Sequence, residues 1–295
     1  EEGGIWPSAG RTQIGGPATG NARSFIYMRS SNSLSVYTHG PTQTTDHTYR
    51  IRGFRSSQTL TDNGDQQIRQ DRDLIPSTLS VDAPSRTYII RIPGSGGPPI
   101  GTSAHVFIAG ISTETDEVVV LAEASEFFAS TPQRWSLPVG ATKTSISAFS
   151  TLIYVSVGRE LRVFLDDFSP VDVFDLPEEP VAIEAWNTSL WMASGSGGLY
   201  HGQVGMNVQI PSGIVWSAVS LPEGANPVAL ATNNLGQVFV LDAGLGRVHV
   251  LDRNGTILFH WTLSERSFDN GQIVVTAGNE AFVLDDDGAV HTYVP

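Results

Sequence analysis

Four short segments of similar composition recur at nearly even spacing through the second half of the chain. Each is an apolar run that ends in a leucine, and the four leucines are Leu137, Leu176, Leu221 and Leu263. Successive leucines are separated by 39, 45 and 42 residues. A period of about 40 residues in a chain rich in strand patterns indicates repeated units of four strands, stacked side by side around an axis.

The clearest unit runs from 235 to 261. Apolar and polar residues alternate over 237–241 and again over 247–251, and two glycines interrupt the alternation between these segments. Alternation with a period of two is typical of β-strands. The following Asn254-Gly255 pair predicts a type I′ hairpin turn, because both residues tolerate positive φ angles, and the chain should then return as an antiparallel strand over 256–261.

The same step extends back to the N-terminus through Ile92, Ile51 and Pro7, which gives seven units. The residues after Leu263 together with the first seven residues make a single period, which is the unit that ends at Pro7. We therefore expect an all-β chain with a single β-propeller domain spanning residues 1–295, with seven blades and an N-terminal strand at about 4–8 that completes the last blade. Closure of this kind removes exposed strand edges.

Six blades are the alternative count. The segment 53–93 has polar flanks, and the stretch from Gln66 to Asp73 is almost wholly hydrophilic, so it could be an insertion instead of a blade. Alternate residues of the inner strands should fill the layers between blades. The residues expected there are Ile153, Val155, Leu190, Met192, Val238 and Val240.

Composition excludes several classes of function. The net charge is -13 and Lys143 is the one lysine, which argues against nucleic acid as a ligand, because phosphate binding draws on clustered Lys and Arg. The absence of cysteine excludes disulfides and thiolate metal sites. No apolar run has the length of a membrane span. The first residue is Glu1 instead of methionine, which indicates processing or excision from a larger chain and favours an extracellular or surface-exposed location.

Residues 236–255 resemble an NHL repeat, with Asp242, Arg247 and Gly255 at the pattern positions. The segments 134–164 and 259–293 are similar to tectonin-type repeats, in which a tryptophan strand precedes an apolar strand and a glycine turn. Both resemblances imply a β-propeller. NHL propellers bind proteins or RNA or act as enzymes, and tectonin propellers are often lectins, so the resemblance implies no single function.

No catalytic, metal or cofactor motif is present. The chain lacks His-Glu-x-x-His, a serine-hydrolase elbow and a phosphate-binding loop. His249 and His291 occupy matching positions of successive units and are explained by the repeat. The acidic turns contain the only calcium candidates, and adjacent aspartates do not imitate the alternate spacing of a calcium loop. These weak candidates are Asp62, Asp65, Asp285 and Asp287.

A non-catalytic propeller that serves as a protein-binding or structural module of a larger assembly fits these observations best. One alternative is a carbohydrate-binding lectin of the tectonin type, in which Trp6, Trp186 and Tyr200 would be the ligand-binding aromatics. The other is a calcium-dependent propeller hydrolase or lactonase. A functional site should lie where the units differ, which is at 66–73, 94–101 and the insertion 202–213.

Overall fold

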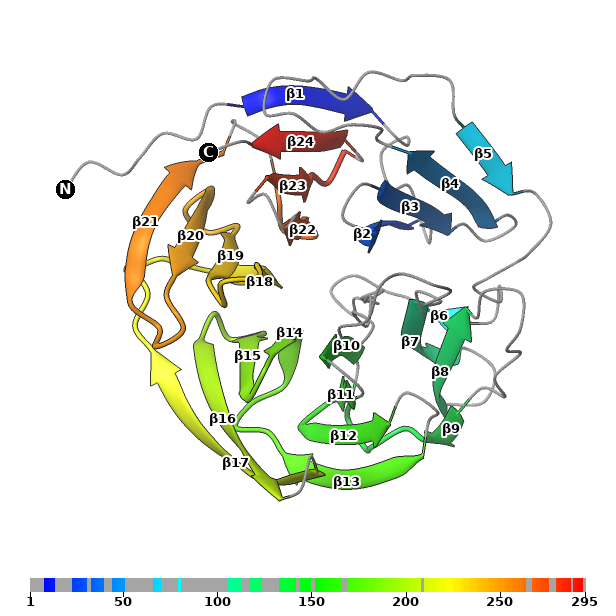
Figure 1. Cartoon of the computed structure of the whole chain (residues 1–295), viewed down its shortest axis with the longest axis vertical. Coiled ribbons are helices and arrows are strands. Elements are labelled where there is room, and N and C mark those ends of the chain that lie inside the picture. The colour runs from blue at the N-terminus through cyan, green and yellow to red at the C-terminus, as the bar shows by residue number, and fades with distance from the viewer. Residues whose placement is uncertain are drawn as a thin grey trace, which may run out of the picture.

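The chain forms an all-β ring of antiparallel sheets around a central axis (Figure 1). The computed structural model describes residues 8–13, 23–30, 33–39, 44–50, 66–69, 79–80, 106–112, 117–123, 133–141, 144–149, 152–165, 169–207, 210–263, 267–275, 280–287 and 289–293. Within these residues the strands make six sheets of four strands each. This is the propeller-like arrangement that the 40-residue period predicted.

Each sheet runs from an inner strand near the axis to an outer strand at the rim (Figure 1). The first contains β2 (Arg23–Ser30), β3 (Ser33–His39), β4 (Thr44–Arg50) and β5 (Gln66–Arg69). The second contains β6 (Leu79–Ser80), β7 (Val106–Ser112), β8 (Glu117–Glu123) and β9 (Gln133–Ser136). The third contains β10 (Thr144–Phe149), β11 (Leu152–Val157), β12 (Glu160–Leu165) and β13 (Pro170–Asp175).

The remaining three sheets follow the same order. The fourth contains β14 (Pro180–Trp186), β15 (Ser189–Ser194), β16 (Leu199–Asn207) and β17 (Ile210–Val219). The fifth contains β18 (Pro227–Thr232), β19 (Val238–Asp242), β20 (Arg247–Leu251) and β21 (Ile257–Thr262). The sixth contains β22 (Gln272–Val275), β23 (Ala281–Leu284), β24 (Ala289–Tyr293) and β1 (Ser8–Gln13).

Seven blades are not confirmed, because the described strands form six sheets. The segment 53–93, which the period assigned to a blade of its own, contributes β5 to one sheet and β6 to the next. Closure by a strand at 4–8 is not confirmed either, since residues 1–7 lie outside the described ranges. The strand that pairs with β24 is β1, with Arg11 opposite His291.

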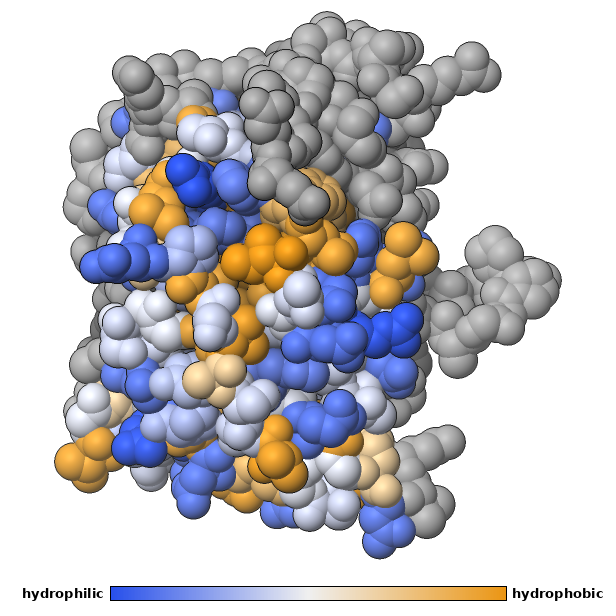
Figure 2. All heavy atoms as spheres, turned by 90° about the vertical axis from the view of Figure 1, so that its left-hand side faces the viewer, coloured by the Kyte–Doolittle hydropathy of each residue, from blue (hydrophilic) through white to orange (hydrophobic). Residues whose placement is uncertain are grey.

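Several middle strands of the blades are buried on both faces. Every residue of β11, β19 and β24 is buried, whereas the outer strand β13 alternates between exposed and half-buried positions. A strand covered by a neighbouring blade on each side favours apolar residues, and the polar residues that these strands do contain, such as Ser156 and Asp242, are hydrogen-bonded. The six residues predicted for the layers between blades are all fully buried, so that prediction is confirmed. The outer surface mixes polar and apolar groups (Figure 2).

The hairpin between β20 and β21 forms where it was predicted but with a different turn. Gly255 has a φ of 89°, while Asn254 is absent from the described residues that have positive φ. The N–H of Gly255 donates to the carbonyl of Asp252 at 3.1 Å, and the register shifts beside Leu251. This is a type I turn followed by a left-handed glycine and a bulge, so the type I′ prediction is wrong. The Asp252 carboxylate accepts the N–H of Asn254 at 2.9 Å and favours this alternative.

Gly236 offers a test of how closely neighbouring blades pack. Its φ is 75°, and a Cβ at this position would lie 2.6 Å from the Trp186 ring of the preceding blade. Gly236→Ala should lower the free energy of unfolding by about 2 kcal/mol, through the positive φ together with displacement of the tryptophan. Gly246 is the matched control, because its φ is 58° and nothing lies within 4 Å of an added Cβ.

Gly246→Ala should lower the free energy of unfolding by about 1 kcal/mol, because alanine is strained at a positive φ and no other contact changes. Urea unfolding of both variants measures the difference. Equal losses would show that Trp186 gives way without cost, and that the contact between the blades is loose at this point.

Candidate functional site

In three consecutive blades the loop that enters the inner strand is fastened to the hairpin turn between the second and third strands. The N–H groups of Gly195, Ala243 and Asp286 donate to carbonyls of the entering loops at 3.0 to 3.1 Å. The accepting residues are Glu179, Asn226 and Ser267. Antiparallel blades place these loops and turns at the same end of the ring. We call this end, formed by 176–179, 195–198, 222–226, 243–246, 267–271 and 285–287, the loop face.

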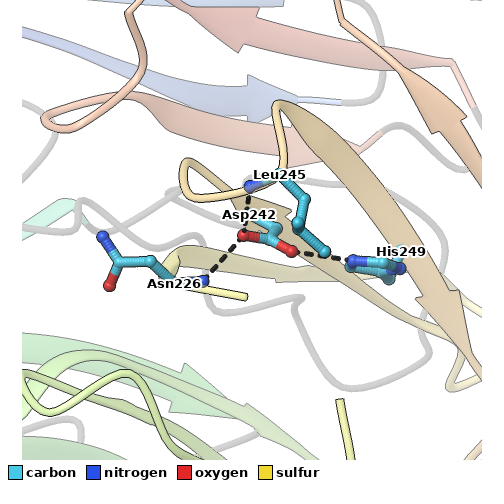
Figure 3. A network of polar contacts seen from close by, with 4 residues as sticks. All are labelled: Asn226, Asp242, Leu245 and His249. Carbon is cyan, nitrogen blue, oxygen red and sulfur yellow. Dashed lines mark hydrogen bonds and ion pairs between the residues drawn. The ribbon is translucent and has the colours of Figure 1, made fainter. Parts of the chain in front are cut away.

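A buried carboxylate holds the fastening of the fifth blade (Figure 3). One oxygen of Asp242 accepts the N–H of Asn226 at 2.8 Å and that of Leu245 at 3.1 Å. The other lies 2.9 Å from His249 Nε2. Burial alone would raise the pKa of the Asp242 carboxyl, but the hydrogen bonds from His249, Asn226 and Leu245 outweigh it and lower the pKa.

The sixth blade repeats this aspartate and histidine. Asp285 accepts the N–H of Ala289 at 2.8 Å and lies 2.7 Å from His291 Nε2. Both histidines and both aspartates are almost fully buried. These groups are closed to any ligand that would approach from solvent, which agrees with the interpretation that the histidines belong to the repeat.

The fourth blade uses an accessible carboxylate instead. Glu178 accepts the Tyr200 hydroxyl at 2.6 Å and also the hydroxyl of Ser196. Ser196 lies 2.8 Å from Ser194, which occupies the position that Asp242 has in the next blade. The hydrogen bond from Ser196, followed by that from Tyr200, lowers the pKa of Glu178. The hydrogen bond to Glu178 raises the pKa of Tyr200 in return.

At the axis, side chains of one inner strand bind the free backbone edge of the next. Ser147 Oγ on β10 accepts the N–H of Ala185 on β14 at 2.7 Å. Glu184 on β14 accepts the N–H of Thr232 on β18 at 3.1 Å and its hydroxyl at 2.8 Å. The inner edges, which lack a further strand, are therefore covered by the neighbouring blade.

Glu184 is the ionisable group that sequence reasoning missed. Its side chain is half-buried, and desolvation raises its pKa to about 7 despite the hydrogen bonds from Thr232. One signal was available, which is a single carboxylate in the otherwise apolar strand 180–186. Glu184 is thus a carboxyl near the ring axis that titrates around neutral pH.

The two described aromatic residues among those predicted to bind a ligand, Trp186 and Tyr200, do not come together. Trp6 lies outside the described residues. Trp186 pairs with Ser189 at one end of its blade, whereas Tyr200 lies beside Leu199 at the other. The Trp186 ring packs 6.3 Å from the Phe149 ring, and the Tyr200 hydroxyl is engaged by Glu178.

Two of the four calcium candidates lie within the described residues. Asp62 and Asp65 lie outside the described ranges, Asp285 is paired with His291, and Asp287 is exposed in the adjoining turn. The described part of the chain holds no group of three metal-ligating side chains. It also contains no helix with the length and apolar character needed to cross a membrane. Of the three variable stretches, 94–101 lies outside the described residues, 66–73 is described only at β5, and 202–213 lies in the hairpin of β16 and β17.

Comparison with solved structures agrees with the ring. Virginiamycin B lyase from Staphylococcus aureus superimposes with a TM-score of 0.55 at 10% identity, over 97% of this chain and 99% of that one. A streptogramin B lyase structure gives a TM-score of 0.51 at 12% identity, over 93% of this chain and 88% of that one. No protein-family model and no curated protein matches the chain. The fold defines the chain as a β-propeller, and identities this low extend the likeness to the fold alone.

Proposed function

We propose that this propeller is a non-catalytic module that binds another protein through its loop face, as part of a larger assembly. The observation that carries the proposal is the fastening of the loop face, repeated in three consecutive blades by the N–H groups of Gly195, Ala243 and Asp286. Loops held in one conformation lose little entropy on binding, which suits a recognition surface.

Close backbone packing adds to this rigidity. A Cβ on Gly244 would lie 2.3 Å from the carbonyl oxygen of Gly224, so turn and loop are in direct contact in the fifth blade. The loop face is also acidic. Its carboxylates outside the buried pairs are Glu178, Glu179, Glu223, Asp269, Asp286 and Asp287. A partner with a basic surface would be complementary, and such complementarity acts on association rate and specificity.

The alternatives have less support. A lectin needs aromatic faces open to a sugar, and Trp186 and Tyr200 are engaged within the fold. A hydrolase could use Glu184 as an acid, but its described neighbours are Thr232 and Ser147, which supply neither a base for a nucleophile nor a further metal-ligating carboxylate or imidazole.

The test begins with the protein that co-purifies with the full chain from its native source, identified by mass spectrometry. Glu223→Lys reverses an exposed charge in the turn 222–225 and should weaken binding of that partner by about tenfold, with a smaller effect at high salt. Asp172→Lys on the outer strand β13 is the control with the same charge change, and should leave the affinity unchanged. Isothermal titration calorimetry compares them. Equal loss in both variants, or a chain that co-purifies with no protein, would contradict the proposal.

A further inference from the structure

The outer strand β17 is unusual among the rim strands. It has ten residues, whereas β13 and β21 have six each. It is the last strand of its sheet, so its outward edge has no strand partner among the described residues. In Figure 1 β17 lies on the rim at the lower left of the ring. A long strand with a free edge is a template for pairing with another extended segment.

No charge protects the edge of β17 against pairing, and its one proline, Pro211, lies near the start of the strand. Its sequence, IPSGIVWSAV, contains no ionisable side chain. Val215 is 76% exposed, and Ile210 at the start of the same strand is 50% exposed. Rim strands normally carry charges that discourage association. β13 has Asp172 and Asp175 in this role.

The strand is complementary to itself. When two antiparallel strands are related by a two-fold axis perpendicular to the sheet, one residue faces its own copy at the axis. With Val215 at that position, Ile214 faces Trp216 and Gly213 faces Ser217 of the second strand. Apolar residues then meet apolar residues, and small residues meet small ones.

We propose that two copies of this chain associate through β17, with Val215 at the two-fold axis, and form one eight-stranded sheet across the pair. The self-complementary sequence selects the second copy as the occupant. Two chains that each carry a net charge of -13 repel one another, and pairing along β17 brings no charged side chain of either copy into contact. The pairing uses the rim and leaves the loop face open, so it does not depend on the proposed function.

The absence of cysteine makes the test direct. In Val215→Cys the two thiols face each other across the axis, and directly opposed strand residues have Cα separations of about 4.5 to 5.5 Å, within the range of a disulfide. Mild oxidation should yield a disulfide-linked dimer on non-reducing gels. Leu258→Cys is the matched control, because Leu258 is 48% exposed on the rim strand β21, which also lacks Asp, Glu, Lys and Arg.

Sedimentation velocity supplies the second measurement. The wild-type chain should be a dimer, and Val215→Lys should weaken association by at least about tenfold, because two lysines would face each other. Leu258→Lys and Glu223→Lys should remain dimeric. Circular dichroism checks folding, which an exposed position should preserve. A wild-type chain that stays monomeric at about 100 μM, or equal cross-linking of both cysteine variants, would overturn the proposal.

Discussion

Asp242→Ala should lower the free energy of unfolding by about 3–5 kcal/mol. The substitution leaves the N–H groups of Asn226 and Leu245 without their acceptor in a buried position, and removes the partner of His249. The His249 side chain is only 1% exposed, so water does not replace the hydrogen bond that it loses. Because Asp242 fastens the entering loop to the turn, the effect should also loosen the loop face of this blade.

Asp252→Ala is the control for this prediction. The Asp252 carboxylate likewise accepts two backbone N–H groups, from Asn254 at 2.9 Å and Thr256 at 2.8 Å, but it does so in an exposed turn. Asp252→Ala should lower the free energy of unfolding by no more than about 1 kcal/mol, since water can satisfy the two N–H groups that lose their acceptor. Urea unfolding followed by tryptophan fluorescence compares the two variants. Similar losses would show that burial of Asp242 contributes nothing beyond the turn itself.

The pH dependence of the same carboxylate has a definite sign. Its pKa in the folded chain lies below the ordinary value, so the unfolded chain binds a proton first as the pH falls. The stability that Asp242 contributes is therefore present above its unfolded pKa and is lost as the pH drops through the folded pKa. Asp242→Ala should consequently show a flatter decline of stability in acid than the wild type.

The recurrence of apolar strand ends predicted the second half of the ring well. Leu137, Leu176, Leu221 and Leu263 each follow the outer strand of a sheet, at the ends of β9, β13, β17 and β21. Each of these leucines packs in or against a hydrophobic cluster of the blades, which is a requirement that these blades share, and so the spacing is visible in the sequence.

Extension of the period into the first hundred residues was less successful. The steps at Pro7, Ile51 and Ile92 lie outside the described residues, and the blade they defined is divided between two sheets. The short strands β5 and β6 have four and two residues, too few for an alternating pattern to show. A period counts repeats of side-chain character and does not reveal which of two neighbouring sheets a strand joins.

The functional residues were predictable only where local sequence decides their role. The acidic turn at Asp285 was visible, but its partner His291 lies across the hairpin and depends on register. Glu184 was missed because its partners Thr232 and Ser147 are 48 and 37 residues away on other blades. Contacts between blades follow from the ring geometry, which no local pattern contains.

Glu184→Gln should make the protein more stable than the wild type above pH 7 by about 3 kcal/mol, with little difference at pH 5. Desolvation raises the pKa of Glu184 to about 7 in the folded chain, well above the ordinary 4.5 of a glutamic acid. Between these values the folded chain keeps a proton that the unfolded chain has released. Stability therefore falls as the pH rises through this window, and levels off above it.

Glutamine avoids this loss because it stays neutral while keeping the geometry. Its amide oxygen can accept from Thr232 as the carboxylate does, and its amide nitrogen can donate towards Ser147. Urea unfolding at a series of pH values from 5 to 8.5 measures the difference in free energy of unfolding between Glu184→Gln and the wild type. The highest pH lies about 1.5 units above the folded pKa, where the carboxyl is almost fully ionised. Glu223→Gln, at an exposed turn, is the matched control and should follow the wild-type curve within about 0.5 kcal/mol.

Parallel curves for the wild type and Glu184→Gln would contradict the prediction. They would mean that Glu184 is ionised in the folded chain throughout this range, and that solvent at the axis replaces what burial removes. A gap that opens between pH 5 and 7 would instead place a neutral carboxylic acid at the junction of β10, β14 and β18. The stability of this junction would then fall as the pH rises, because the ionised carboxylate is poorly solvated where the three blades meet, although it accepts its hydrogen bonds from Thr232 and Ser147 more strongly than the neutral acid does.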